Sequence, residues 1–495
     1  MRNLLTAGAL LLFGAGVNPA QAPNAEVIRV DPSAVGKPFP HTWDQMFGSG
    51  RAILSLRESW RRDLAAVKRV TQFRYVRFHG IFNDEVGVYD EDSQGRPVYN
   101  WSYVDQIYDG LLENDVRPFV ELSFMPKKLS SSDHVHAFWY KPFPNPPKDY
   151  AKWAALVDAF ARHLIERYGI QEVSQWYFEV WNEPNIDFWT GKPAQSTYFE
   201  LYDSAAKALK HVDSRLRVGG PATAQAAWVG DFLAHCAAAK VPVDFASTHV
   251  YGNDSAHDVF GANENIPRRD MVARSVRKVH QEVLSSPLPD TPIIWSEYNA
   301  SYSNEVAVTD SPFMGAWLAN NIRMCDGLQT IMAYWDFSDV FEEQGVVKTP
   351  FYGGYGLIAA GGIPKPAFGA FSLLAKLGTV RLPSTSENAL ITRAENGALE
   401  IAVWNYAEPE QAGSPRTFTI DLGTPHAVSI YRLDDTHGSS LAAWRAMGSP
   451  SHPTKPQIQR LREAALIPAP EQRQAEPRIQ LTIPAHGLVV VEVPR

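Results

Sequence analysis

WYFEVWNEPN, residues Trp176–Asn185, combines the pattern of a buried strand with a polar end. Its first residues are aromatic and β-branched, and its last ones include Glu183. Parallel barrels place catalytic groups in this way, at the C-terminal ends of their strands. A second apolar run, Pro292–Asn299 (PIIWSEYN), ends similarly and contains Glu297. Two glutamates at strand ends among aromatic residues favour glycoside hydrolysis by double displacement.

On either side of these two runs, short apolar segments alternate with longer amphipathic ones. We expect strands at Thr42–Phe47, Tyr75–His79, Phe119–Phe124, Trp176–Trp181, Arg217–Gly220, Phe245–Val250, Ile293–Tyr298 and Ile331–Trp335. We expect helices at Trp60–Val70, Tyr103–Asn114, Asp149–Tyr168, Gln195–Val212, Trp228–Ala238, Met271–Leu284, Pro312–Cys325 and Ala367–Lys376. Eight strands that alternate with eight helices predict an α/β fold, the (β/α)8 TIM barrel, with parallel strands.

The length of 495 residues is too great for one ordinary core. We assign residues 23–380 to the catalytic barrel and 381–495, where short alternating runs and Pro/Gly/Asp turns begin, to a C-terminal β-sandwich domain. A strand near residues 26–30 is a candidate member of that β domain. Gln457–Ala465 is expected to form a short helix within it.

Residues 1–22 have the pattern of a signal peptide. Arg2 precedes an apolar stretch, Leu4–Gly16, and Ala20–Ala22 (AQA) resembles a cleavage site. We therefore expect an exported protein, periplasmic or extracellular, without a membrane anchor once the signal is removed; an uncleaved anchor is the alternative. Cys236 and Cys325 lie in helix-like contexts and are expected to be buried free thiols.

Composition disfavours several other functions. The formal net charge is −8 and there is no basic cluster, so nucleic acid is not an expected partner. His134 and His136 have no neighbouring carboxylate pattern, Gly354–Gly356 does not have the spacing of a phosphate loop, and there is no Gly-x-Ser-x-Gly motif. We expect no metal and no cofactor. Aromatic residues reach 12%, and some of the 14 tryptophans are candidate sugar platforms.

The two glutamates suit different roles. Glu183 is predicted to be the general acid/base, with a pKa raised by burial among aromatic residues. Glu297 is predicted to be the nucleophile that attacks the anomeric carbon. Glu179 competes for a role but, from strand alternation, lies deeper and is expected to be structural. Asn182 is placed to donate to a sugar 2-hydroxyl.

Other polar residues stand at the ends of the neighbouring strands. Arg77 and His79 share one face, where an arginine can keep a carboxylate ionised and a histidine can bind hydroxyls. His249 and Tyr251 repeat this spacing, and the tyrosine hydroxyl can orient the nucleophile. Each histidine or arginine has a structural alternative, as a satisfied core residue.

Two later features add to the predicted sugar site. Trp335 ends the eighth strand and is a candidate platform for a sugar ring. Glu342 or Glu343 is a candidate ligand of the terminal sugar, and the alternative is a solvated charge pair. The long segment Met125–Pro147 is expected to be a functional loop: if it closes a pocket it favours exo action, and if it leaves an open groove it favours endo action.

Together these motifs resemble family 39 of the glycoside hydrolases, which contains β-xylosidases and α-L-iduronidases. The resemblance rests on Trp181–Asn185, Ile293–Asn299, His249–Tyr251, Glu121–Pro126, Phe138–Lys141 and Asp339–Glu343. It implies a retaining enzyme with Glu183 as acid/base and Glu297 as nucleophile, and with Asn182, His79, His249, Tyr251 and Trp335 around the terminal sugar.

Gly252–Asp258 contains no lysine or arginine to bind a uronate, so a neutral β-linked sugar is favoured, xylose first. The expected partner is a xylo-oligosaccharide or an aryl glycoside. The alternatives are a β-glucosidase, a β-mannosidase or an endo-acting glycosidase, then an α-L-iduronidase, and last a non-catalytic carbohydrate-binding protein. The oligomeric state stays open.

Overall fold

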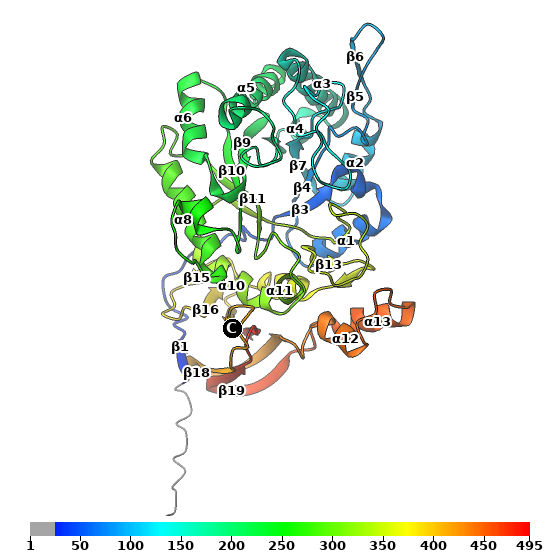
Figure 1. Ribbon diagram of the computed structural model, residues 1–495. Helices are drawn as coiled ribbons and strands as arrows, with labels where there is room; N and C mark the ends of the chain where they lie inside the picture. Colours follow the sequence, from blue (N-terminus) through cyan, green and yellow to red (C-terminus); the bar gives the residue numbers. More distant parts are fainter. Residues whose placement is uncertain (1–24) are drawn as a thin grey trace, which may run out of the picture.

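The computed structural model describes residues 25–495, so the predicted signal peptide lies outside the described residues. A barrel ringed by helices sits above a strand-rich domain that contains the C-terminus (Figure 1). Within residues 25–495, none of the helices has both the length and the apolar character required to cross a membrane.

Eight parallel strands close into a barrel, which confirms the predicted (β/α)8 fold. In barrel order they are β3 (Met46–Arg51), β4 (Tyr75–His79), β7 (Arg117–Leu122), β8 (Tyr177–Val180), β9 (Arg217–Thr223), β10 (Phe245–Tyr251), β11 (Ile293–Asn299) and β12 (Ile331–Tyr334). The outer helices are α1 (Glu58–Lys68), α2 (Ser102–Leu112), α3 (Tyr150–Tyr168), α5 (Ala194–Val212), α6 (Val229–Ala239), α8 (Arg268–Leu284), α10 (Phe313–Cys325) and α11 (Pro366–Leu374).

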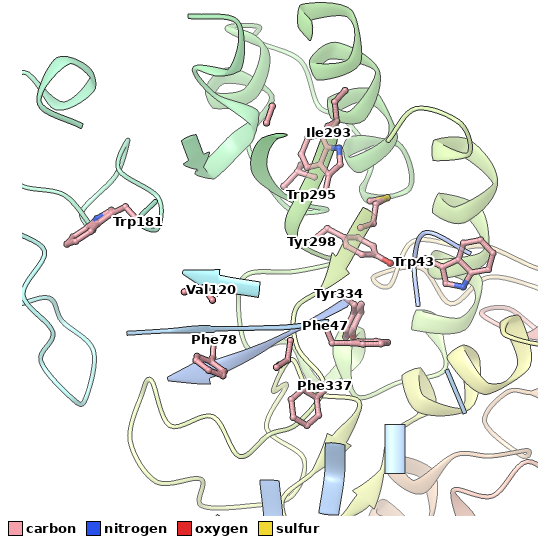
Figure 2. Close-up of a cluster of buried hydrophobic side chains, with 14 of the residues drawn as sticks. Trp43, Phe47, Phe78, Val120, Trp181, Ile293, Trp295, Tyr298, Tyr334 and Phe337 are labelled. Atoms are coloured by element: carbon pink, nitrogen blue, oxygen red, sulfur yellow. The ribbon is translucent and has the colours of Figure 1, made fainter. Parts of the chain in front are cut away.

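The outward faces of the strands pack against these helices. Tyr298 on β11 stacks on Trp317 of α10 with ring centroids 5.9 Å apart, and Phe47 on β3 meets Phe371 of α11 at 5.2 Å. Tyr298 also meets Tyr334 of β12 edge to face, in the cluster that Figure 2 shows. Aromatic residues bury more apolar area than other side chains, so this layer contributes much of the barrel's stability.

A separate apolar layer fills the lower barrel interior. It contains Met46, Phe119, Phe245, Ile294 and Ile331, each from a different strand. These side chains fill the lower part of the barrel interior, so a cavity that reaches into the barrel must open above them, at the C-terminal ends of the strands.

The first barrel strand begins later than predicted, at Met46 and not at Thr42. The strand contains Gly48 and Gly50, which an apolar pattern does not assign to a strand. Gly48 is required by packing, because a β-carbon there would lie 2.1 Å from the ring of Trp335. The small residues of β3 therefore make room for an aromatic ring that lines the site described below.

The second domain is the predicted β domain. Its strands are β1 (Glu26–Arg29), β2 (Lys37–Pro38), β15 (Val380–Leu382), β16 (Ala389–Arg393), β17 (Leu399–Trp404), β18 (Arg416–Leu433), β19 (Glu471–Ile483) and β20 (Leu488–Val493). Instead of two separate sheets, hydrogen bonds join all eight strands into one, because the long β18 pairs with β1 along its first half and with β20 along its second.

The β domain has a core of its own but also packs on the barrel. Ile28, Ile391, Ile401, Phe418 and Val491 belong to its separate core. Trp404, Leu433 and Leu488 join the large barrel core instead. The two domains therefore share one apolar boundary beneath α10 and α11.

Short elements complete the description. They are η1 (Ala52–Leu56), β5 (Tyr89–Glu91), β6 (Pro97–Tyr99), α4 (Ile170–Val173), η2 (Ala224–Ala226), α7 (Ala256–Phe260), α9 (Val306–Thr309), β13 (Ile358–Ala359), β14 (Ile363–Pro364), α12 (Ser440–Ala446) and α13 (Lys455–Ala464). A capping box of Thr454 and Gln457 begins α13. Cys236 and Cys325 are both buried and free.

Candidate active site

A cavity of about 460 Å³ opens at the C-terminal ends of the barrel strands. Its walls come from strand ends and from the loops that follow them. They are formed by His79, Phe138, Asn182, Glu183, Ile186, Phe188, Ala224, Gln225, Tyr251, Asp254, Glu297, Tyr302, Trp335, Glu343, Gln344 and Tyr355.

Seven of the nine residues predicted for the site line this cavity: Glu183, Glu297, Asn182, His79, Tyr251, Trp335 and Glu343. The other two, Arg77 and His249, do not. Both are fully buried and contact the carboxylates from behind. Their ring and guanidinium nitrogens are already engaged by protein groups, so they position other side chains and do not face a ligand.

Arg77 joins four strands through one guanidinium group. Its nitrogens lie 2.6 Å from Glu179, 2.8 Å from Glu121 and 2.6 Å from Glu297, and one nitrogen donates to Asn182 at 2.9 Å. Glu179 is fully buried beside Arg77, outside the walls of the cavity. This position matches the structural role predicted for Glu179.

A β-bulge directs Glu297 toward Arg77. Thr248 of β10 pairs with Trp295, but the next residue, His249, pairs with Glu297, so β11 has one extra residue. Trp295 and Tyr298 both belong to the core of the helix layer, while Ser296 and Glu297 contact groups of the site. Such bulges re-aim side chains beside active sites.

Strand alternation is interrupted before Glu183. Regular strand alternation would place Trp181 on the same face as Glu179 and Glu183, but its φ is +74°, and its ring packs against Trp153 of α3. Glu183 itself has a φ of +44°, and its N–H donates to the carbonyl of Ala222 at 2.8 Å. These left-handed conformations cost energy, and they bring Glu183 to the mouth of the barrel.

His249 and Tyr251 fix the two carboxylates. Nδ1 of His249 lies 3.0 Å from Oε1 of Glu183, and Nε2 lies 3.1 Å from Oγ of Ser296. The Tyr251 hydroxyl donates to Oε2 of Glu297 at 2.6 Å. Burial, together with the charges of Arg77 and His79, lowers the pKa of His249 well below its usual value, so this imidazole is neutral near pH 7.

The two cavity glutamates differ in protonation. Burial raises the pKa of Glu183 well above its usual range, and the negative charge of Glu297 raises it further. Burial also raises the pKa of Glu297, but Arg77, His79 and the Tyr251 hydrogen bond oppose that effect. The direct contact with Arg77 therefore favours the ionised form of Glu297 and leaves the proton on Glu183.

Glu342 and Glu343 occupy different surroundings. Glu342 pairs with Arg57 and Arg51, whose charges outweigh the effect of burial and lower its pKa. Glu343 lines the cavity, with Oε1 3.5 Å from Nε2 of His79, and burial raises its pKa well above its usual range. Of the two predicted candidates, Glu343 is the one that can meet a ligand.

One oxygen of Glu183, one nitrogen of His249 and one oxygen of Glu297 lie within 4.8 Å of one another. This spacing suits a metal ion, but the donors are already engaged. His249 uses both nitrogens, and Glu297 accepts from Arg77 and Tyr251. The set is better suited to proton transfer and nucleophilic attack than to metal binding.

Several cavity residues were missed by the sequence analysis because they lie in loops or, in the case of Gln225, in the short helix η2. Ile186, Gln225, Asp254, Tyr302 and Gln344 follow strands without an apolar pattern that would place them. Phe138 differs from these residues, because it belongs to the loop after β7, Met125–Pro147, which was expected to be functional. Its position on the cavity wall could be found from loop length but not from residue type.

Comparisons with known proteins identify the family of the chain. The model of "Glycosyl hydrolases family 39" matches residues 26–478. The chain belongs to this family. A β-xylosidase of Geobacillus stearothermophilus is 38% identical over 460 residues, covering 90% of each chain. The crystal structure of a monomeric β-xylosidase from Caulobacter crescentus CB15 is 33% identical with a TM-score of 0.86, over 95% of this chain and 99% of that one.

A human α-L-iduronidase is also similar, at 28% identity over 310 residues, which are 58% of this chain and 44% of the relative. The family match, the long relatives and the paired glutamates together show that the protein is a glycoside hydrolase.

The Arg77 network predicts a specific loss of stability. Arg77→Met leaves three buried carboxylates without their cation, which typically costs roughly 3–5 kcal/mol of unfolding free energy. Without Arg77, burial should raise the folded-state pKa values of Glu121 and Glu297 above their unfolded ones. The native variant then binds extra protons, so its stability rises as pH falls. Urea unfolding at pH 5 and pH 7 measures both effects.

Arg117→Met is the matched control. Arg117 also pairs with a glutamate, Glu172, but in a partly exposed site, where an ion pair is worth about 0–1 kcal/mol. The proposed role of the network would be contradicted if the two variants lost equal amounts of unfolding free energy. It would also be contradicted if the loss in Arg77→Met did not depend on pH.

Proposed function

We propose that the protein is a retaining exo-glycosidase that removes terminal β-linked xylose from xylo-oligosaccharides, with Glu297 as nucleophile and Glu183 as acid/base. The observation that supports this proposal most directly is that two carboxyl groups lie close together but have different partners. Glu297 is held by Arg77 and Tyr251, whereas Glu183 is held by a neutral histidine.

The separation of the two groups supports retention. Oxygens of Glu183 and Glu297 lie within 4.8 Å of each other. In retaining enzymes the carboxyl groups are about 5–5.5 Å apart, whereas inverting enzymes keep them roughly 6.5–9.5 Å apart to admit a water molecule.

The first chemical step is glycosyl transfer to the enzyme. An oxygen of Glu297 forms a bond to the anomeric carbon while the glycosidic C–O bond breaks, and Glu183 gives its proton to the departing oxygen. In the second step Glu183 takes a proton from water, the water oxygen attacks the anomeric carbon, and the ester to Glu297 breaks. Asn182, oriented by Arg77, is placed to donate to the 2-hydroxyl of the sugar.

The charge of the cavity supports a neutral sugar. Within residues 25–495, the residues that line it include no lysine or arginine, but they include Glu183, Asp254, Glu297 and Glu343. A uronate carboxyl group would find no lysine or arginine to pair with there. This argues against α-L-iduronidase activity despite the similarity to the human enzyme. Xylose is supported by the long relatives that are named β-xylosidases.

The loops support exo action. The N–H of Trp139, in the loop after β7, donates to the carbonyl of Glu343, in the loop after β12, at 2.8 Å. Trp139 also covers Gly345. This link joins the two loops beside Glu343 on the cavity wall, which supports a binding place there for the non-reducing end of the terminal sugar. The proposed export of the enzyme rests on the N-terminal sequence alone.

Substrate preference is the direct test of this proposal. Aryl glycosides that differ only in the sugar should be hydrolysed in the order xyloside first, then glucoside or mannoside, with α-L-iduronide not hydrolysed above background. The rates of nitrophenol release measure this order. A preference for the iduronide would reject the assignment of a neutral sugar.

Glu297→Ala should abolish turnover, because no group then forms the covalent intermediate. Azide should partly restore the reaction by attacking in place of the carboxylate and should yield a xylosyl azide of α configuration, which NMR identifies. Rescue by azide in Glu179→Ala, and not in Glu297→Ala, would identify a different nucleophile.

Glu183→Ala should affect substrates according to their need for a proton. Hydrolysis of xylobiose, whose leaving group is poor, should fall by roughly 10²–10⁴-fold, the usual contribution of general acid catalysis. A dinitrophenyl xyloside should show a burst of phenolate and then a slow steady state, because deglycosylation lacks its base. Stopped-flow absorbance records the burst. Equal losses on both substrates without a burst would exclude Glu183 as acid/base.

A further inference from the structure

Lys365, the residue before α11, is buried and lies outside the walls of the cavity. Its Nζ lies 2.8 Å from Oδ1 of Asp310 and 3.0 Å from Oδ2 of Asp339, and it donates to the carbonyl of Gly354 at 2.7 Å. An ammonium group has three N–H donors, and these three acceptors match that number. All donors of Lys365 are therefore directed at protein groups.

The three charged groups of this cluster are fully buried. Burial lowers the pKa of Lys365, but the charges of Asp310 and Asp339 outweigh this effect and raise it overall, so the lysine stays protonated. Stability alone is a weak explanation for buried ion pairs, because well-packed apolar residues of similar volume often stabilise a protein as much or more. The cluster is better explained by the backbone that it holds in place.

The two aspartates bind the backbone of one loop after β12. Oδ2 of Asp310 accepts the N–H of Gly353 at 2.7 Å, and Oδ1 of Asp339 accepts the N–H of Gly356 at 2.8 Å. Lys365 binds a carbonyl between these two amides. The cluster thus fixes the short segment 353–356 at three points.

The glycines of this segment are required by the same contacts. Gly353 has a φ of +80°, which favours glycine. A β-carbon at Gly354 would lie 2.4 Å from Oδ1 of Asp339, and one at Gly356 would lie 2.4 Å from the backbone nitrogen of Asp339. The glycine pattern, which does not have the spacing of a phosphate loop, is therefore explained by the close approach of the loop to this aspartate.

Tyr355 is the one large side chain in the segment 353–356, and it lines the cavity. Its hydroxyl donates to the carbonyl of Tyr302 at 2.6 Å. Its ring belongs to an aromatic cluster with Tyr251, Trp335 and Phe341. Since this cluster includes the tyrosine that donates to the proposed nucleophile, the position of Tyr355 affects the wall around the terminal sugar.

We propose that Lys365 is a positioning residue for the sugar site. Together with Asp310 and Asp339 it fixes the segment 353–356, and the segment holds Tyr355 at the cavity wall. The inference rests on the proposed function because it places the terminal sugar in this cavity, but it does not depend on which sugar binds.

The first test is Lys365→Met, measured with nitrophenyl β-xyloside. KM should rise roughly ten-fold, the effect of one misplaced aromatic contact, while kcat changes by less than about two-fold, because Tyr355 contacts no reacting group. Initial rates give both constants, and near-UV circular dichroism shows that the variant is folded. An unchanged KM in the folded variant would overturn the proposal.

Lys210→Met is the matched control. Lys210 also pairs with an aspartate, Asp244, at 2.7 Å and donates to a backbone carbonyl, that of Ser214, at 3.0 Å. It lies outside the cavity walls, so its loss should leave KM and kcat unchanged. A KM in Lys210→Met that rises as much as in Lys365→Met would show a general effect of losing a lysine ion pair and would overturn the specific role of Lys365.

Tyr355→Ala removes the side chain through which Lys365 is proposed to act. This variant should itself have a raised KM. Adding Lys365→Met to it should raise KM further by less than about two-fold, because residues that act through one another are not additive. If the two effects on KM multiply, Lys365 acts independently of Tyr355 and the proposal is wrong.

Asp310→Asn provides the answer if Lys365→Met does not fold. It leaves Lys365 paired with Asp339, so the buried charges are balanced. Asp310 uses one oxygen for Lys365 and the other for Gly353, whereas an asparagine side chain has a single acceptor oxygen. KM should therefore rise in this variant as well, and a wild-type KM would reject the positioning role.

The substrate separates this inference from the proposed function. If the wild type hydrolyses a different aryl glycoside and not the xyloside, the assignment of xylose fails, and the KM ratios on that glycoside test Lys365 in the same way. If the wild type hydrolyses the xyloside but Lys365→Met has an unchanged KM, the proposed function stands and the role of Lys365 is rejected.

Discussion

The contact between Arg77 and three buried carboxylates is the interaction on which the site depends. Glu121, Glu179 and Glu297 come from β7, β8 and β11, and one guanidinium from β4 holds them together. Desolvation of these charges is costly and is offset only if every pair stays in place. The network therefore ties the position of the proposed nucleophile to the packing of the whole barrel, and small shifts of one strand affect all four residues.

Sequence patterns predict the parts of this arrangement that depend on strand periodicity. Arg77 and His79 share a face of β4, so their common direction follows from alternation. The prediction fails where the backbone leaves that geometry. The bulge in β11 places Ser296 and Glu297 on the same side, and the positive φ of Trp181 turns its ring to the helix layer. Neither feature has a local sequence signature, because both are imposed by tertiary contacts.

Loops and long-range pairing limit prediction further. The end of β3 was misplaced because glycine does not continue an apolar pattern, and Gly48 is required by the ring of Trp335, a residue almost three hundred positions away in sequence. The strand β19 was missed because its first part is polar and mostly exposed, and only Ile479, Leu481 and Ile483 at its end alternate as in a half-buried strand. Ile186 and Tyr302 were missed for a related reason: they lie outside the strands, and only the fold brings them to the wall of the cavity.

The charges of Glu297 and Arg77 explain how Glu183 can act in both proposed steps, first as an acid and then as a base. The negative charge of Glu297 contributes to the raised pKa of Glu183. When Glu297 becomes an ester of the sugar, that charge disappears and the pKa of Glu183 falls. Glu183 has by then given up its proton, and the lower pKa keeps it ionised until water arrives. Departure of the sugar restores the charge on Glu297 and raises the pKa of Glu183 again. Arg77 allows this cycle because its direct contact stabilises the ionised form of Glu297. Its lowering effect on the pKa of Glu183 is weaker than the raising effect of burial.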